Sequence, residues 1–328
     1  MTELLAPGKE VDTLEATTAD GSPVSVSVVR ISSGQPGPVL MAIAAMHGTE
    51  YASMAALGRL IQKTKPEDVS GTLVLVPVAN RLAFDTRTMY VCPPDGKNLN
   101  RVFPGRPDGT YAEMLADLLW RHVASSASCI LDVHGGEIVE GLFPFTGAYV
   151  RDGQPDVGET SRRAAEAFHP PYLVLNQLPA HVDRHAQRLS LIGTDAGIPS
   201  VLVEAGERGL LEEADIRFIY EGVRNVMRLL GMLAEPVRPA LTRPVVVREQ
   251  PVFAHSTGLF HAKVKPGDLI SPGQQLGEVI DQFGRSIERF VSEWDGVVLG
   301  VIGPAVVEGR MPLVVGVIVD GWAPHQPL

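Results

Sequence analysis

The sequence predicts an α/β protein with a mixed sheet, followed by a smaller all-β region. Over residues 1–240, apolar runs of strand length alternate with amphipathic helical segments, which is the repeating unit of α/β folds. A linker near residue 240 contains several prolines. It is followed by short apolar runs separated by Pro-Gly and Asp-Gly turns, a pattern typical of a small sandwich or half-barrel. We therefore expect two domains, residues 1–240 and residues 241–328.

The composition limits the partners and the compartment. The 328 residues carry a formal net charge of −10 without a basic run, which argues against nucleic acid or an anionic membrane surface as a partner. The N-terminus lacks the features of a signal peptide, and no apolar run approaches the roughly 20 residues of a spanning helix. Two cysteines are too few for a disulfide framework. These observations predict a cytoplasmic protein and leave its oligomeric state, including a homo-oligomer, open.

The elements of the first domain follow from pattern and punctuation, in chain order. Residues 24–31 alternate and are β-branched, which predicts a strand at the border of the sheet, and the wholly apolar residues 39–46 predict a buried strand. An amphipathic helix at residues 51–62 and a buried strand at residues 71–78 follow. Residues 80–109 are rich in Arg, Asn, Pro and Gly without a sustained period, which predicts a long functional loop. Beyond it we expect helices at residues 110–123, 159–168 and 211–233 and strands at residues 129–134, 172–176 and 198–204.

Three of the predicted buried strands end in residues that can bind metal ions or transfer protons. His47 and Glu50 follow the strand at residues 39–46, His134 ends a second strand, and Glu204 ends a third. The carboxyl ends of parallel strands meet at one edge of a sheet, so these side chains should converge. Two His and one Glu, with a fourth position left to water, form a zinc-ligand set of hydrolytic sites. We expect His47, Glu50 and His134 to bind one Zn2+ per chain.

Such a site needs a base and a fixed positive group. Metal-bound water loses a proton near neutral pH and becomes a nucleophile, and a nearby carboxylate can pass that proton to the leaving amine. Glu204 is the predicted general base, although a strand-end Glu can also be a helix cap or an exposed charge. Arg101 is the predicted oxyanion donor, with Arg87 as second choice.

Other polar residues have both a functional and a structural interpretation. Asn98 and Asn100 are candidate substrate-binding residues, or they satisfy the loop backbone. Asp132 either orients the imidazole of His134 or caps a helix. Cys92 has no pairing that marks it as a nucleophile, so an inert thiol is expected.

Arg188 is a candidate contact for an anionic group of the substrate. Together with His181, Arg184 and His185 it falls at helical spacing, which is also typical of a solvated helix face.

These motifs, taken together, resemble one known family. His47-Gly-Thr-Glu50, Asn98-Leu-Asn-Arg101-Val-Phe-Pro-Gly105, Asp132-Val-His134 and Glu204-Ala-Gly206 are similar to motifs of the succinylglutamate desuccinylase/aspartoacylase family, relatives of the zinc carboxypeptidases. The resemblance implies a mixed-sheet zinc carboxypeptidase-like domain and an amidohydrolase that removes an acyl group from an amino acid or a related amine. It also implies the roles given above, with Glu204 as general base and acid and with Asn100 beside the substrate-binding Arg101.

The longer forms Asp-Gly-Lys-Asn-Leu-Asn-Arg and Ile-Pro-Ser-Val-Leu-Val-Glu are similar to the bacterial branch that includes the N-acetyl-diaminobutyrate deacetylases of ectoine breakdown. Two positions depart from the family, because Arg81 stands where members carry Pro and Met89 where they carry Arg. Arg87 is the candidate replacement for that Arg. The departure makes acetylaspartate and succinylglutamate poor first guesses as substrates.

The C-terminal residues 264–319 resemble a biotinyl/lipoyl-like sandwich. Their turn Glu293-Trp294-Asp295-Gly296 lacks the Lys that would carry biotin or lipoate. In the family such an appendage narrows the approach to the zinc site, which favours a small substrate.

The sequence thus predicts zinc-dependent hydrolysis of an N-acyl amide, of N-acetyl or N-succinyl type, on a small amino-acid derivative. The acyl group and the amine stay open. The alternatives are a carboxypeptidase-like metallopeptidase and a catalytically silent module that binds zinc or a small ligand.

Overall fold

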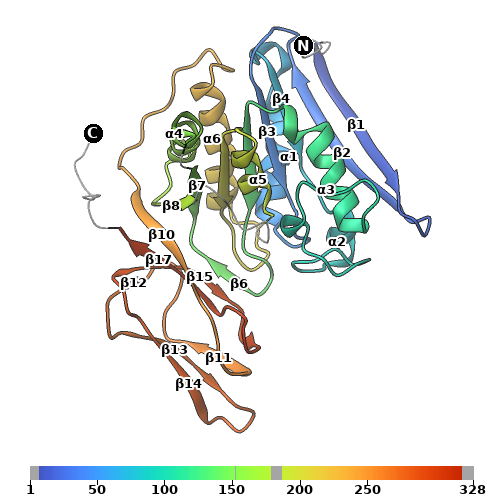
Figure 1. The fold of residues 1–328 in the computed structure, drawn as a ribbon. Helices are drawn as coiled ribbons and strands as arrows, with labels where there is room; N and C mark the ends of the chain where they lie inside the picture. The colour runs from blue at the N-terminus through green and yellow to red at the C-terminus, as the bar shows by residue number, and fades with distance from the viewer. Residues whose placement is uncertain (1–6, 152, 179–186, 320–328) are drawn as a thin grey trace.

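The computed structural model describes residues 7–151, 153–178 and 187–319, and these residues form two sheets (Figure 1). The larger sheet has 13 strands and the smaller has 4. The strands are β1 (Gly8–Thr17), β2 (Pro23–Ser32), β3 (Val39–Ala44), β4 (Thr72–Val76), β5 (Cys129–His134), β6 (Glu140–Leu142), β7 (Phe145–Arg151), β8 (Tyr172–Leu178), β9 (Ser200–Glu204), β10 (Val245–Val252), β11 (Gly258–Ala262), β12 (Leu269–Ile270), β13 (Gln275–Ile280), β14 (Ser286–Val291), β15 (Gly296–Ile302), β16 (Ala305–Val306) and β17 (Leu313–Ile318). The helices are α1 (Tyr51–Lys63), α2 (Arg81–Thr86), α3 (Tyr111–His122), α4 (Pro155–Glu166), α5 (Leu189–Asp195) and α6 (Glu213–Leu229), with 3-10 turns at Pro66–Asp68, Leu99–Arg101 and Ala124–Ser126.

Four parallel strands in the order β4-β3-β5-β9 form the middle of the large sheet. Both faces of these strands are buried because side chains alternate between two apolar layers: Leu40 of β3 packs in one, and Met41 in the other. The first layer is covered by α1, α4 and α6, and the second by α3 and α5. The carboxyl ends of β3, β5 and β9 therefore lie at one edge, between the helical layers.

The predicted order of strands and helices is confirmed for most of residues 7–240. The strands and helices expected there are present, and the antiparallel pair of β1 and β2 forms the border of the large sheet. The boundaries differ by a few residues, most clearly for the helix predicted at residues 211–233, which is α6 (Glu213–Leu229).

Several elements were not predicted. Residues 80–109 are not a continuous loop, because the short helix α2 begins after Asn80, whose side chain accepts a hydrogen bond from the Ala83 amide. Six residues are too few to show a helical period, so Asn80 as a capping residue was the one local signal for this helix. The strands β6 and β7 and the seven-residue helix α5 were also missed.

The C-terminal strands extend the large sheet as well as forming a second one. β10 pairs in parallel with β8, and β17, β15 and β12 continue the large sheet beyond β10. The small sheet β14-β13-β11-β16 packs against this extension across an apolar layer that includes Phe260, Phe290 and Val315. The sandwich expected from the turn pattern is therefore built from the small sheet and the end of the large one, and it forms the lower lobe in Figure 1.

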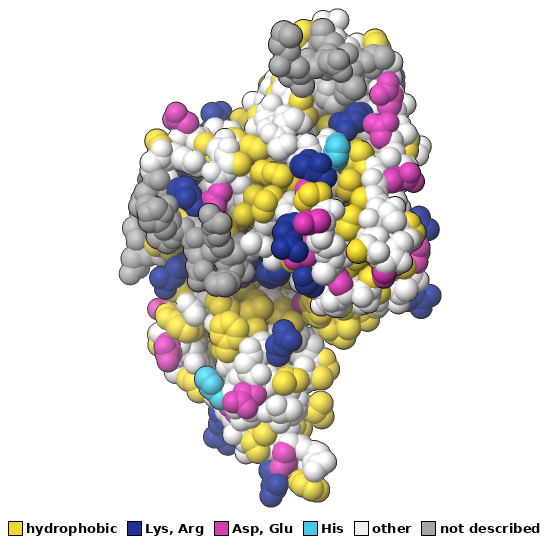
Figure 2. Space-filling model, turned by 45° about the vertical axis from the view of Figure 1, so that its right-hand side comes forward, with side chains coloured by type: hydrophobic (Ala, Val, Ile, Leu, Met, Phe, Trp, Pro, Cys, Tyr) yellow, Lys and Arg dark blue, Asp and Glu magenta, His cyan; other side chains and the backbone are white. Residues whose placement is uncertain are grey.

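Charged side chains of both signs are interspersed on the face shown in Figure 2, and hydrophobic side chains gather where the lower lobe joins the main body. Within the described residues, no helix combines the length and apolar character needed to cross a bilayer.

Candidate active site

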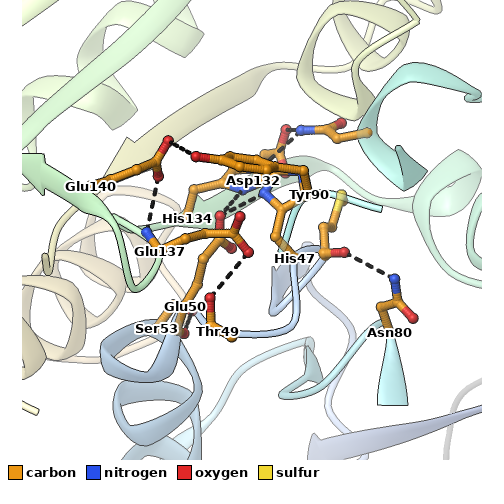
Figure 3. A network of polar contacts seen from close by, with 12 residues as sticks. His47, Thr49, Glu50, Ser53, Asn80, Tyr90, Asp132, His134, Glu137 and Glu140 are labelled. Carbon is orange, nitrogen blue, oxygen red and sulfur yellow. Dashed lines mark hydrogen bonds and ion pairs between the residues drawn. The ribbon is translucent and has the colours of Figure 1, made fainter. Parts of the chain in front are cut away.

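His47, Glu50 and His134 come together at the carboxyl edge of the parallel strands (Figure 3). His47 and Glu50 lie in the turn between β3 and α1, and His134 is the last residue of β5. Ala45, with a φ of 54°, changes the direction of the chain at the end of β3, and its carbonyl accepts a hydrogen bond from the Asn80 amide at 3.0 Å. One nitrogen or oxygen atom from each of the three side chains lies within 4.8 Å of the others.

Hydrogen bonds orient the two imidazoles in the same way. His47 Nδ1 lies 2.7 Å and His134 Nδ1 3.2 Å from Glu50 Oε1. On the far side of each ring, His47 Nε2 lies 3.2 Å from Asn98 Oδ1 and His134 Nε2 lies 2.8 Å from Asp132 Oδ1. An Nε2–H that donates to each of these oxygens leaves both Nδ1 lone pairs facing Glu50, which is the arrangement metal-binding histidines need.

The three residues fit a divalent metal ion. Two imidazole nitrogens and a carboxylate form a donor set found in hydrolytic zinc sites. Glu50 is 3% exposed, and its Oε2 has no hydrogen-bond partner among the described residues. A buried carboxylate oxygen without a donor is costly, and a cation at the cluster would satisfy it. Glu50 and His134 are buried and His47 is only partly so, which leaves the cluster open on the His47 side.

Asp132 and Asn100 support the buried side of the cluster. Asn100 Oδ1 accepts from the Leu189 amide at 2.8 Å, so its amide nitrogen faces Asp132 Oδ2 at 3.2 Å and lies 2.9 Å from His134 Nε2. The Ser190 amide, at the start of α5, also donates to Asp132 Oδ2 at 3.4 Å. Asp132 thus meets both descriptions given above, since it contacts the His134 ring and a helix N-terminus.

Glu204 ends β9 directly opposite His134 in the parallel register. Burial raises the pKa of its carboxyl to about 8, although the nearby His134 lowers the pKa in part. A carboxyl with a pKa near neutrality can both accept and donate a proton, which suits a general base and acid.

Arg101 and Arg188 lie near each other beside the site. Arg101 donates from Nη1 to the Asn100 carbonyl at 2.7 Å, and desolvation together with the charge of Arg188 lowers the Arg101 pKa. Arg188 directly precedes α5 and donates from Nη1 to the Tyr149 hydroxyl at 3.3 Å, with Glu249 Oε2 of β10 at 3.9 Å. Burial opposes its charge, but Tyr149 and Glu249 keep its pKa above the usual value. Two adjacent guanidinium groups can bind an anion.

The structure describes Arg87, but it does not describe most of the residues predicted at helical spacing with Arg188. Arg87 is exposed at the C-terminal end of α2, where its backbone N–H donates to the Phe84 carbonyl at 3.2 Å, and its side chain makes no hydrogen bond or ion pair with the part of the chain that the structure describes. His181, Arg184 and His185 lie outside the described residues.

Sequence reasoning missed an acidic group next to the cluster. Glu137, Glu140, Tyr90 and Thr49 form a connected set of side chains beside His47 and Glu50 (Figure 3). Burial raises the pKa of Glu137 to about 8 and also raises that of Glu140. A signal was present, because His134-Gly-Gly-Glu137 repeats the His-x-x-Glu spacing of His47-Gly-Thr-Glu50.

Cys92 is fully buried. Its sulfur lies 3.1 Å from Asn80 Nδ2, and burial raises the pKa of the thiol to about 12. A thiol that stays protonated is a poor nucleophile, which agrees with the inert thiol expected from the sequence.

Comparison with known proteins places the chain in a family. Residues 36–230 match the model of the succinylglutamate desuccinylase/aspartoacylase catalytic domain. This match, the mixed α/β fold and the donor cluster define the class of protein, an amide-hydrolysing α/β enzyme. The chain belongs to the succinylglutamate desuccinylase/aspartoacylase family, and within it to the branch that includes N-acetyl-diaminobutyrate deacetylase.

Three relatives illustrate the likeness. The N-alpha-acetyl-L-2,4-diaminobutyric acid deacetylase of Halomonas elongata is 30% identical over 295 residues, which cover 86% of this chain and 82% of the relative. The product-bound ectoine utilization protein EutE (DoeB) of Ruegeria pomeroyi has a TM-score of 0.84 and 28% identity, over 96% of this chain and 97% of that one. A succinylglutamate desuccinylase/aspartoacylase of Rhodobacter sphaeroides has a TM-score of 0.82 at 24% identity, over 96% and 97% of the two chains, and so shows the shared fold.

Proposed function

We propose that this protein is a zinc-dependent hydrolase that removes the acyl group from an N-acyl amide on a small amino-acid derivative. One observation carries the proposal: His47, Glu50 and His134 converge with lone pairs inward, and Glu204, with its raised pKa, ends the adjacent strand. The name of the Halomonas elongata relative, an N-alpha-acetyl-L-2,4-diaminobutyric acid deacetylase, supports an N-acetyl group and a diamino acid as a first choice, with N-succinyl compounds as the second.

The roles of the residues follow from their positions. His47, Glu50 and His134 would hold one zinc ion per chain, which when bound polarises a carbonyl and makes water more acidic. Glu204 would accept a proton from the attacking water and return it to the leaving nitrogen. Arg101 would donate to the oxygen that becomes negative as the carbonyl is attacked.

Asn98, Asn100 and Arg188 would define the substrate pocket. Asn98 and Asn100 are held in place by their contacts with His47 and with the start of α5. Arg188, which is steadied by Tyr149 and Glu249, would bind the carboxylate of the amino-acid part. A role of Arg87 in carboxylate binding is supported only by its position in the sequence, close to Met89, where family members carry Arg.

Two alternatives make different predictions. A carboxypeptidase-like metallopeptidase would release a C-terminal residue from peptides, and the adjacent Arg101 and Arg188 are the observation that favours it. A silent zinc-binding or ligand-binding module would have no use for a carboxyl poised near neutrality such as Glu204, and this argues against it.

The test is to measure amine release from a panel of N-acetyl and N-succinyl amino acids and diamino acids. Release of the C-terminal residue from dipeptides is measured in parallel. The proposal expects release from at least one N-acyl compound and little from the dipeptides. Release from dipeptides alone would favour the metallopeptidase, and binding without any release would favour the silent module.

We also propose that residues 1–240 form the hydrolase domain and residues 241–328 a biotinyl/lipoyl-like domain that restricts the approach to the site. The supporting observation is that β15 of the C-terminal part pairs with β6, which directly follows the loop after His134. The absence of a basic run and the low cysteine content support a cytoplasmic enzyme with small-molecule substrates.

A further inference from the structure

Glu137 is a buried carboxylate beside the site. The reaction proposed above assigns it no role. Its side chain is 0% exposed. Oε1 accepts a hydrogen bond from the Thr49 hydroxyl at 3.2 Å, and Oε2 has no partner among the residues that the structure describes. In Figure 3 the carboxylate lies next to Glu50 and His47, on the side of the cluster where Tyr90 lies. Glu137 thus offers one free oxygen to a donor that enters the site.

The surrounding contacts fix this carboxylate in place. Glu140 Oε2 accepts from the Glu137 amide at 2.9 Å, and Glu140 Oε1 accepts from the Tyr90 hydroxyl at 2.8 Å. Glu140 itself belongs to β6 and is paired with Ile302 of β15. Because Glu140 uses both oxygens to hold its neighbours, the oxygen left for a ligand is the one on Glu137.

The charges around Glu137 favour a cationic partner. Within residues 7–151, 153–178 and 187–319, neither Glu137 nor Glu140 forms an ion pair with a Lys or an Arg. A buried carboxylate without a paired cation or a full set of donors is unfavourable. A primary ammonium group would supply both the missing donor and the missing charge.

We propose that Glu137 Oε2 binds a free ammonium group of the substrate, so that the preferred substrates are N-acyl derivatives of diamino acids. This inference rests on the proposed function and narrows its substrate class. The name of the Halomonas elongata relative agrees with it, because N-alpha-acetyl-L-2,4-diaminobutyric acid keeps an unacylated amino group at position 4. The guanidinium group of Arg188 would bind the carboxylate of the same molecule, as proposed above.

A pair of isosteric substrates tests the inference. Nα-acetylnorvaline has a methyl group where Nα-acetyl-2,4-diaminobutyrate has its ammonium. The parent enzyme should prefer the diamino compound by about 10- to 100-fold in kcat/KM, the range that one charge-assisted hydrogen bond supports. Glu137→Gln, which keeps the shape and removes the charge, should lose most of this preference while changing the norvaline rate by less than about threefold.

Product binding gives a readout that does not depend on turnover. Calorimetry should show that the parent binds 2,4-diaminobutyrate more tightly than norvaline, that Glu137→Gln binds the two alike, and that the surface control Glu67→Gln behaves as the parent. If Glu137→Gln does not fold, Glu137→Asp, whose carboxylate is one methylene shorter, should show a reduced preference.

Three results would overturn the inference: equal treatment of the two substrates by the parent, an equal loss on both substrates in Glu137→Gln, or loss of bound metal in Glu137→Gln, which would make Glu137 a metal ligand. Failure of the proposed function is distinguishable, since the parent would then cleave neither compound. Calorimetry would still decide whether Glu137 recognises an ammonium group.

Discussion

At the scale of single residues, Glu204 and His134 occupy paired positions on the adjacent strands β9 and β5, but we expect substitutions of the two residues to have different effects. Glu204 has no place in the donor cluster, whereas His134 supplies one of its three donor atoms. A change at Glu204 should therefore affect proton transfer, and a change at His134 should affect the metal.

Glu204→Gln should retain metal and lose about 10²- to 10⁴-fold in kcat, because the amide keeps the shape of the side chain but cannot accept the proton. Metal analysis and steady-state kinetics on the same preparation check this. Turnover at the parent rate would remove Glu204 from the mechanism.

His134→Ala should lower the metal content well below that of the parent, because the cluster keeps only two donors. The matched control is His122→Ala at the exposed end of α3, which should bind metal as the parent does. A His134→Ala protein with full metal would exclude His134 from the ligand set.

The raised pKa of Glu204 also affects stability in the metal-free protein. Its pKa is raised from 4.5 to about 8 in the folded state, so the unfolded chain releases this proton first as the pH rises. The contribution of Glu204 to the free energy of unfolding is therefore fully present below pH 4.5 and is lost progressively as the pH rises toward 8. Glu204→Gln should consequently raise the melting temperature of the metal-free protein by a few degrees at pH 8.5 and have little effect at pH 4.5. An equal effect at both pH values would contradict the assigned pKa.

At the scale of elements, the junction after β9 sets the distance between Glu204 and the cluster. Gly206 has a φ of 100°, and a Cβ there would lie 2.7 Å from the Ala52 Cβ in α1. This close approach keeps the carboxyl end of β9 against the first turn of α1, which directly follows Glu50.

Gly206→Ala should destabilise the protein by about 2–4 kcal/mol, since it combines backbone strain with a steric clash. Gly197→Ala is the matched control, because Gly197 also has a positive φ but nothing lies within 4 Å of its Cβ position. The control should cost only about 1 kcal/mol. Chemical denaturation measures both, and equal costs would show that the contact with Ala52 is unimportant.

The sequence allowed the element pattern and the convergence of His47, Glu50 and His134 to be predicted, because apolar runs mark buried strands and the carboxyl ends of parallel strands share one edge. It did not reveal α2, which is shorter than the window that shows a helical period. The role of Glu140 was also hidden, because β6 has three residues and is defined by pairing with a strand about 160 residues later in the chain. Long-range pairing of this kind leaves no local pattern.

At the scale of the whole molecule, the C-terminal strands are part of the structure around the site. β10 covers the edge of β8, and an apolar layer joins Phe145 and Leu202 of the main body to Val247, Leu299 and Val314. The pairing of β6 with β15 also holds Glu140, and through it Glu137.

Deletion of residues 241–328 should therefore yield a poorly soluble or unstable protein, because it exposes a strand edge and an apolar layer. Any folded fraction should lose the preference for a substrate with a free ammonium group. Size-exclusion chromatography and thermal denaturation measure the outcome. A monomeric, stable fragment with unchanged preference would show that residues 1–240 need no support from the C-terminal strands.

The central claim, a zinc-dependent N-acyl hydrolase, is tested most directly by titrating chelator-stripped protein with zinc while following amine release from Nα-acetyl-2,4-diaminobutyrate. We predict no activity before zinc is added and a linear recovery that ends at one equivalent per chain. Full activity in protein shown by elemental analysis to be free of metal would contradict the claim.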